Sequence, residues 1–426
     1  MSQHAVLSPS GAEKWMNCSG APAMEQGLSD SATDYSDHGT AAHLLGSVCL
    51  EQGKHPLEFE GRRIVVGLTD VFDGAAFEGE QDPRFVVRRT YPVDEEMVAA
   101  IGRYVDRVRE YVGTGILLAE QRLSISSFTG EAGAAGTADA TGILPDELQV
   151  HDLKYGMGVK VFAKRNKQLM IYALGVRESV ELTYGPFKKI RLVIHQPRLE
   201  HLDEWDCTSE ELDAFAEEVK VAADKALFIY ENPGLLSAVE LNPSDDACRW
   251  CKAKPTCPKL AKFVADSAAM DFEAIDAAPQ IPGGSVILAQ KMAAIPLIED
   301  WCKAIRAKVE SELFAGVAIP GWKLVQGKRG NRSWKDVEAA DALLKLMRMP
   351  MEDRYKMTLL SPTQIERALK PTPKRLQRVL DAKLVEQRDG LPSVAPESDP
   401  RPVWAPPDQA KDFTVAPESV VPLNAA

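Results

Sequence analysis

Long apolar runs are missing from this sequence of 426 residues, and no stretch approaches the length of a membrane span. The amino-terminal segment MSQHAVLSPSGAEKW lacks the basic-then-apolar layout of a signal peptide. No Gly-x4-Gly-Lys-Ser/Thr phosphate-binding loop occurs, so there is no helicase motif of that type, and no internal repeat is found. These absences favour a cytoplasmic globular protein.

Charge and cysteine content argue against two further classes of protein, general nucleic-acid coats and disulfide-bonded proteins. Lys and Arg (50) are outnumbered by Asp and Glu (62), and the net charge of −12 argues against a general nucleic-acid coat. A localised basic channel is still compatible with that total, because binding depends on the local field. The odd number of cysteines, seven, argues against a disulfide framework.

Hydrophobic periodicity and turn residues predict an α/β arrangement. Helices are expected at 7–18, 37–53, 94–112, 160–178, 209–230, 286–314, 337–347, 361–370 and 373–384. Strands are expected at 63–66, 85–87, 116–125, 134–144, 148–155 and 189–195, and a basic hairpin over 322–334. The expected organisation is a domain over 1–265 built on a small mixed sheet flanked by helices, a mainly helical extension over 270–389, and a Pro-rich flexible tail over 390–426.

The most informative stretch is a predicted β-hairpin that turns at residues 145–147. Because residues i and i+2 of a strand face the same side, Asp152 and Lys154 project together and Leu153 points into the core. Asp139 lies on the neighbouring strand and reaches the same place. Alone, an Asp-x-Lys sequence favours a surface hairpin that carries ordinary charges, and it is the surrounding residues that favour a metal site.

Two carboxylates beside a lysine suit a hard divalent cation such as Mg²⁺ or Mn²⁺. Such an ion lowers the pKa of bound water, and the lysine can orient that water or hold a phosphate oxygen. His43 is either a packed helix residue or the imidazole that completes the coordination. In the following helix, Gln168 and Tyr172 lie four residues apart and share a face.

Three cysteines form a second cluster, Cys248-x2-Cys251-x5-Cys257. Thiolates at this spacing suit zinc or an iron–sulfur cluster, and both usually need a fourth ligand. Cys18 is the expected fourth ligand, because it ends the amino-terminal helix beside Trp15 and precedes a turn of small residues. The remaining cysteines are expected to be buried small hydrophobes: Cys49, Cys207 and Cys302.

Two basic groups could contact phosphates, although each is also compatible with an ordinary solvated surface. The first is expected on the helix after the hairpin: Lys160, Lys164, Arg165 and Lys167. The second lies between Trp322 and Trp334, where stacking plus charge could hold a single strand. Its members are Lys328, Arg329 and Arg332.

Six features, in order over residues 7–265, carry a resemblance to a known family. They are LSPSGAEKWMNC (a Ser-x-Ser helix ending in a cysteine), GTAAH (Gly-Thr-x-x-His), GTADA (Gly-x-x-Asp), HDLK (Asp/Glu-x-Lys), Gln168-x3-Tyr172, and the late cysteine trio. The chain resembles the RecB-type PD-(D/E)XK nucleases with an iron–sulfur cluster, which include CRISPR adaptation exonucleases and AddB-type helicase–nuclease subunits. The resemblance implies a restriction-endonuclease-like core.

The resemblance also implies roles for individual residues. The metal, Mg²⁺ or Mn²⁺, would be bound by His43, Asp139, Asp152 and the Leu153 carbonyl. Lys154 would assist the attacking water, while Gln168 and Tyr172 would contact DNA near the scissile phosphate. A [4Fe–4S] cluster, with zinc as the alternative, would join the amino-terminal helix to the end of the nuclease domain through Cys18, Cys248, Cys251 and Cys257. Glu120 matches a frequent acidic position whose role is not fixed.

The expected function is therefore a metal-dependent DNA exonuclease that hydrolyses DNA from a free end in phage recombination or replication, in the host cytoplasm. A non-catalytic DNA-binding protein and a zinc-stapled interaction protein of the same fold are the alternatives. PGWKLVQGKRGNRSW, SPTQIERALK and PESDPRP resemble a phage-encoded family of unassigned function. The carboxyl-terminal part is expected to recruit a single-strand annealing or binding protein.

Overall fold

The computed structural model describes residues 5–28, 33–69, 73–237, 240–269, 284–325, 336–355, 364–365 and 373–381. One compact unit spans Met1–Gln326 and a second spans Gly327–Ala426. The interval 265–270, where a domain boundary is expected from the sequence, falls inside the first unit. The expected tail over 390–426, most of the helix at 361–370 and residues 326–334 of the basic hairpin lie outside the described residues.

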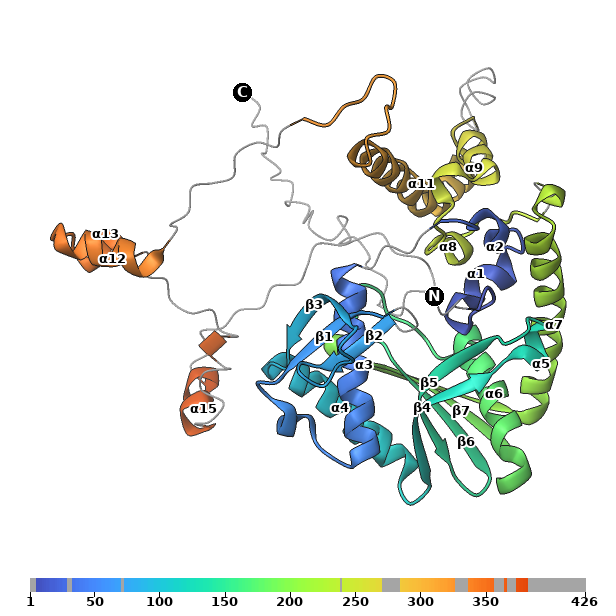
Figure 1. Ribbon diagram of the computed structural model, residues 1–426, viewed down its shortest axis with the longest axis horizontal. Coiled ribbons are helices and arrows are strands. Elements are labelled where there is room, and N and C mark those ends of the chain that lie inside the picture. The colour runs from blue at the N-terminus through green and yellow to red at the C-terminus, as the bar shows by residue number, and fades with distance from the viewer. Residues whose placement is uncertain are drawn as a thin grey trace, which may run out of the picture. The chain divides into compact units, whose positions relative to one another are not determined.

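A five-stranded mixed sheet forms the centre of the first unit (Figure 1). Its strands are β4 (Ile116–Ser124), β5 (Ala135–Ile143), β6 (Glu147–Leu153), β7 (Lys189–Gln196) and β8 (His201–Thr208), in that spatial order. Neighbouring strands are antiparallel except β6 and β7, which are parallel. The predicted hairpin is thus confirmed as β5–β6, and the predicted mixed sheet flanked by helices is confirmed as well.

Three further strands make a small antiparallel sheet of order β2-β1-β3. They are β1 (Arg63–Leu68), β2 (Asp73–Phe77) and β3 (Val86–Pro92). The sequence predicts β1 and only the start of β3, at 85–87. It predicts no strand at β2, because the run DGAAF combines two poor strand formers with two alanines.

The helices of the first unit have the following bounds. They are α1 (Ala12–Asn17), α2 (Ala21–Met24), α3 (Asp34–Gln52), α4 (Glu95–Val112), α5 (Ser126–Thr129), α6 (Lys167–Tyr184), α7 (Ser209–Glu231), α8 (Asp245–Cys248), α9 (Pro258–Ala269) and α11 (Gly284–Phe314). Short 3₁₀ turns occur at η1 (Pro9–Gly11), η2 (Pro56–Phe59), η3 (Pro197–Leu199), η4 (Pro233–Leu235) and η5 (Lys254–Thr256). The second unit contains α12 (Val337–Leu346), α13 (Met351–Arg354) and α15 (Pro373–Asp381). Within the described residues, no helix combines the length and apolarity needed to cross a membrane.

Capping explains how two of these helices begin. The α6 helix begins at Lys167 instead of 160, because the Asn166 side chain accepts a hydrogen bond from the Leu169 N–H at 3.1 Å. The α7 helix begins as expected at Ser209. Its cap is the preceding residue, Thr208, which forms a reciprocal capping box with Glu211.

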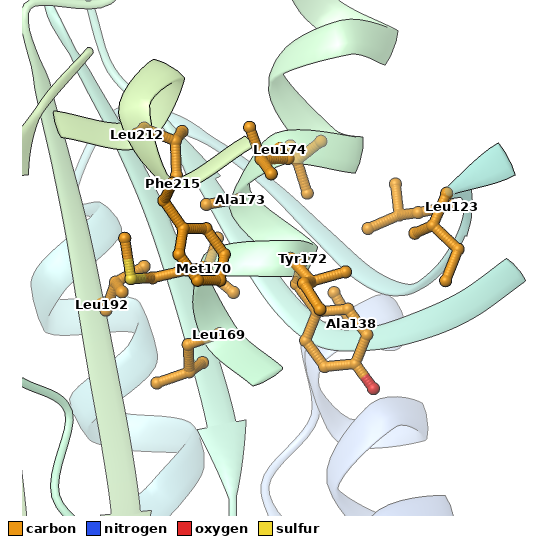
Figure 2. Packing of buried hydrophobic residues seen from close by; sticks show 14 of the residues in the cluster. Leu123, Ala138, Leu169, Met170, Tyr172, Ala173, Leu174, Leu192, Leu212 and Phe215 are labelled. Atoms are coloured by element: carbon orange, nitrogen blue, oxygen red, sulfur yellow. The ribbon is translucent and has the colours of Figure 1, made fainter. Parts of the chain in front are cut away.

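Buried side chains of α6 fix that helix against the sheet and against α7 (Figure 2). Leu169, Met170 and Ala173 are fully buried or nearly so. They belong to the same apolar cluster as Leu192 of β7 and Phe215 of α7. Each such side chain stabilises the fold by about 1.5–3 kcal/mol when it is large and fully buried. The helix that carries Gln168 and Tyr172 is therefore held in one position.

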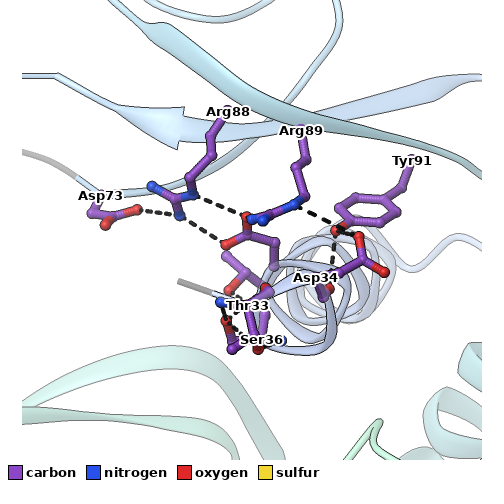
Figure 3. A network of polar contacts seen from close by, with 9 residues as sticks. Thr33, Asp34, Ser36, Asp73, Arg88, Arg89 and Tyr91 are labelled. Atoms are coloured by element: carbon purple, nitrogen blue, oxygen red, sulfur yellow. Dashed lines mark hydrogen bonds and ion pairs between the residues drawn. The ribbon is translucent and has the colours of Figure 1, made fainter. Parts of the chain in front are cut away.

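The small sheet holds the start of α3, the helix that carries His43 (Figure 3). Asp37 is 2% exposed and receives a two-pronged hydrogen bond from Arg88 at 2.8 and 2.9 Å, and it also pairs with Arg89. The Arg88 hydrogen bonds are the main reason that the pKa of Asp37 lies below its usual value, although burial opposes this. Arg88 further binds Asp73 at 3.1 Å, so β2, β3 and α3 meet at one buried charge.

Candidate active site

The strand register brings three acids to equivalent positions on adjacent strands. The ladder partners around them are Ala119↔Ala140, Gln121↔Ala138 and Ala140↔His151. This register sets Glu120 of β4 across from Asp139 of β5, and one further step along β5 and β6 sets Asp139 across from Asp152. Directly opposite residues on paired strands lie close together, so three carboxylates gather in one row.

Asp139 is the central member of this row. Its Oδ1 lies 3.1 Å from His43 Nδ1, and its Oδ2 accepts a hydrogen bond from the Leu153 N–H at 2.7 Å. Burial works against ionisation of Asp139, but His43, the Leu153 N–H and Lys154 together hold its pKa below the usual value. Burial likewise opposes protonation of His43, but the charge and hydrogen bond of Asp139 raise its pKa to about 9. The two side chains therefore form a partly buried ion pair.

Glu120 joins this pair and completes a donor set. One ligand atom from each of His43, Glu120 and Asp139 lies within 4.8 Å of the other two. Burial, and then the charge of Asp139, raise the pKa of Glu120 to about 7. The backbone of Glu120 is also strained, with φ of +45°, a left-handed conformation that costs a non-glycine residue about 1 kcal/mol or more.

The donor set differs from the expected one. The expected ligands included Asp152 and not Glu120, whereas the compact group contains Glu120 and not Asp152. The register places Glu120 and Asp152 on the strands either side of Asp139, but the Asp152 carboxylate is engaged by Lys154 and Gln168. The sequence did mark Glu120, as an acid on the strand before the hairpin. The Leu153 N–H is engaged by Asp139, and the expected role of its carbonyl as a ligand stays a prediction.

Asp152, Lys154 and Gln168 form a second group beside the first. Lys154 Nζ lies 2.9 Å from Asp152 Oδ2 and donates to Gln168 Oε1 at 3.0 Å. Gln168 Nε2 in turn donates to Asp152 Oδ1 at 3.0 Å, so the amide is held in one orientation. Burial lowers the pKa of Lys154, but Asp152 outweighs it and the net shift is upward. The ammonium group is therefore charged and fixed.

Tyr172 closes this second group from the side of α6. It is 7% exposed, and its hydroxyl accepts a hydrogen bond from Gln168 Nε2 at 3.4 Å. Burial is the main reason that its pKa is raised. A Cβ on Gly136 would lie 2.8 Å from a ring carbon of Tyr172 and 2.7 Å from Pro9 Cγ, so only glycine fits there without a shift. The glycine of GTADA therefore makes room for this tyrosine.

The expected basic ridge does not form one helix face. Of its four residues only Lys167 lies in α6, and its Nζ donates to Glu13 Oε1 and Asn17 Oδ1, both at 2.9 Å. Arg165 pairs with Glu218 at 3.1 Å. Lys160 and Lys164 are exposed in the segment before α6. The second basic group, Lys328, Arg329 and Arg332, lies outside the described residues.

The four expected cysteine ligands do come together. Cys18, Cys248, Cys251 and Cys257 line one cavity with apolar neighbours. Cys18 is the C-cap of α1, as expected, and its Sγ accepts a hydrogen bond from the Asn242 N–H at 3.3 Å. Burial is the main cause that raises the pKa of the Cys18, Cys248 and Cys251 thiols. Within the described residues no three of the sulfurs lie within 4.8 Å of one another.

Several hydrogen bonds join the two segments that supply these thiols. The Gly20 N–H donates to the Glu240 carbonyl at 2.9 Å, and the Lys252 N–H donates to Glu25 Oε1 at 2.7 Å. On the other side, α11 contacts η5, and Leu297 packs with Cys248 and Leu260. The three other cysteines were expected to be buried. Cys49 and Cys207 are buried, whereas Cys302 is half-buried.

Comparison with known proteins gives a family, and the matches among solved structures include a weak one. Residues 4–402 match the model of a family described as "Protein of unknown function (DUF2800)", and the chain belongs to that family. A solved structure titled "Crystal structure of SSO0001" is 15% identical, with a TM-score of 0.21. That match covers 37% of this chain and 66% of the solved one, which is just under two thirds of its length.

Proposed function

We propose that this member of the DUF2800 family is a metal-dependent DNA exonuclease built on a PD-(D/E)XK core. One observation carries the proposal. A charged lysine, Lys154, is fixed by Asp152 and Gln168 next to a donor set of one imidazole and two carboxylates. A half-buried lysine paired with one buried acid adds little to stability by itself, because desolvation offsets most of the attraction. In a hydrolytic centre, by contrast, a fixed ammonium group beside a metal site would stabilise the charge on a phosphate.

The donor set fits a divalent metal ion. Glu120 and Asp139 face one another, and the repulsion between them contributes to the raised pKa of Glu120. A cation between them would relieve this repulsion, and hard oxygen donors with one imidazole suit Mn²⁺ or Mg²⁺. His43, Glu120 and Asp139 would hold the ion, with Asp152 beside them. When bound, such an ion polarises a phosphate and lowers the pKa of bound water.

The residues of the second group would position the reactants. Lys154 stays protonated through its contact with Asp152, so its ammonium group offsets the charge that develops on the phosphate. Gln168 keeps Lys154 in place, and its Nε2 would reach the substrate backbone by exchanging its hydrogen bond to Asp152 or Tyr172. The Tyr172 hydroxyl, hydrogen-bonded to Gln168, is the remaining polar group on this side. Each of these groups is already oriented, which reduces reorganisation during hydrolysis.

The cysteine site is proposed to hold a [4Fe–4S] cluster. A tetrahedral zinc ion with bonds of about 2.3 Å keeps its sulfurs about 3.8 Å apart. The four thiols share one cavity, but no three of these sulfurs lie within 4.8 Å of one another. Their wider spacing supports a larger group over a single ion, and the hydrogen bond from the Asn242 N–H to Cys18 is of the kind that stabilises a ligating sulfur.

The test is a cleavage assay on DNA labelled at either end, single- and double-stranded, with Mn²⁺ or Mg²⁺. We expect stepwise loss from an end, at least 100-fold slower in Asp152→Ala. Lys188→Ala is the matched control, because that lysine is 80% exposed and pairs only with a surface aspartate, Asp146. Substrate that stays intact with every metal and label, although the protein binds it, would support a non-catalytic DNA-binding protein instead.

A further inference from the structure

The segment that holds Cys248, Cys251 and Cys257 is positively charged, although the chain as a whole is negative. Residues 247–265 contain no Asp or Glu, whereas the whole sequence has a net charge of −12. The segment carries five cations: Arg249, Lys252, Lys254, Lys259 and Lys262. A local positive field of this kind attracts a polyanion even when the total charge is negative.

Trp250 projects from the middle of this positive segment. It is 77% exposed, whereas Cys248 and Ala253 on either side of it are only 7% and 1% exposed. Trp250 belongs to none of the apolar clusters formed by the described residues, whereas Trp301 packs against Cys248 and its neighbours. A large aromatic ring left in water beside cations has no packing role and is free to stack on another ring.

The loop that carries Trp250 is held at several points. The Cys251 N–H donates to the Cys248 carbonyl at 3.1 Å, and the Lys252 N–H donates to Glu25 Oε1 at 2.7 Å. Lys254 Nζ donates to the Arg249 carbonyl at 2.8 Å, so its charge lies beside the peptide that precedes Trp250. Binding to this loop requires little ordering of the backbone, which favours affinity.

We propose that Trp250 stacks on a base of single-stranded DNA while Arg249 and Lys254 contact the flanking phosphates. A single strand is the partner that fits, because its bases are unstacked and its backbone supplies one anion per nucleotide. The inference rests on the proposed DNA substrate. The cysteine segment is connected to the active site through α1, which contacts α8 and binds Lys167 through Glu13 and Asn17. Gln168 is the next residue.

Binding of fluorescent oligonucleotides in EDTA tests the proposal without any hydrolysis. We expect Trp250→Ala to weaken binding of a single strand by roughly 5- to 150-fold, Trp250→Tyr to restore most of the affinity, and a blunt duplex to be affected little. Phe228→Ala is the matched control, because Phe228 is also exposed (55%) but lies on the acidic helix α7. Iron and sulfide content confirms that each variant keeps its cysteine site.

The charge of the loop is tested separately. Removing one phosphate contact in Lys254→Gln should reduce the salt dependence, the slope of log affinity against log salt, by about 0.7. The same change in Lys220→Gln on α7 should leave that slope unaltered, since Lys220 pairs with Glu217. If the Trp250→Ala protein binds single strands as tightly as the unaltered protein, the role of Trp250 is refuted, while the proposed exonuclease activity is not affected. If single-strand binding depends on Trp250 but no metal supports hydrolysis, the role of Trp250 stands and the proposed exonuclease activity is refuted.

Discussion

Replacing Glu120 by glutamine removes one of two carboxylates that face each other. This change should raise the stability of the metal-free protein and weaken its binding of a metal ion. Burial and Asp139 raise the pKa of Glu120 from 4.5 to about 7 in the folded protein. A folded pKa above the unfolded one means that folding disfavours the charged form, so metal-free stability falls as pH rises from about 4.5 to 7. A glutamine side chain carries no charge, so Glu120→Gln should abolish this fall.

The size of the effect follows from the shift. An unscreened rise from 4.5 to about 7 corresponds to about 3 kcal/mol at pH 8, and water around the partly open Glu120 reduces this to about 1–2 kcal/mol. In EDTA at pH 8, Glu120→Gln should therefore unfold at a higher temperature than the unaltered protein. With Mn²⁺ the order should reverse, because the ion stabilises only the protein that binds it tightly.

Thermal unfolding at several pH values, with EDTA and with Mn²⁺, measures both effects in one series. Glu147→Gln is the matched control, since Glu147 lies on the same sheet but pairs with Lys189 at 2.8 Å. The reasoning about facing carboxylates is refuted if Glu120→Gln is no more stable than the unaltered protein in EDTA. It is also refuted if Mn²⁺ raises the unfolding temperature of both proteins equally.

Three further changes test the surroundings of the site. Gly136→Val should cost about 1–3 kcal/mol of unfolding free energy in denaturant titrations, because its side chain meets Tyr172. Asp37→Asn should cost about 2–4 kcal/mol in the same measurement, because it leaves the Arg88 and Arg89 charges without their buried partner. Burial lowers the pKa of His195 to about 3, so this residue should contribute a fall in stability of about 1.4 kcal/mol per pH unit below 6.5, and His195→Asn should remove that contribution.

Local patterns in the sequence were enough to predict the hairpin and its polar pair. The alternation around Asp152 and Lys154 fixes which side chains face together, and the structure places Lys154 Nζ 2.9 Å from Asp152. The residues alone left His43 open between a packed helix residue and a ligand, and Cys18 was chosen as the fourth thiol from its place at a helix end; the resemblance then implied a role for each. No pattern within one element shows which distant elements will meet.

The features that were missed depend on tertiary context. The strand β8 alternates in burial but is rich in charge, with two aspartates and one glutamate, and it lies at the sheet edge where such residues are tolerated. The start of α6 depends on a single cap at Asn166. The place of Glu120 depends on register between β4 and β5, which no local sequence signal sets.

The central claim is that Lys154 serves hydrolysis at a metal site that other residues hold. The most direct measurement compares Mn²⁺ affinity, by calorimetry, with the rate of nucleotide release from labelled DNA in Lys154→Ala. The account predicts Mn²⁺ affinity within about tenfold of the unaltered protein and a rate at least 100-fold lower. Nucleotide release at the unaltered rate in Lys154→Ala would contradict it.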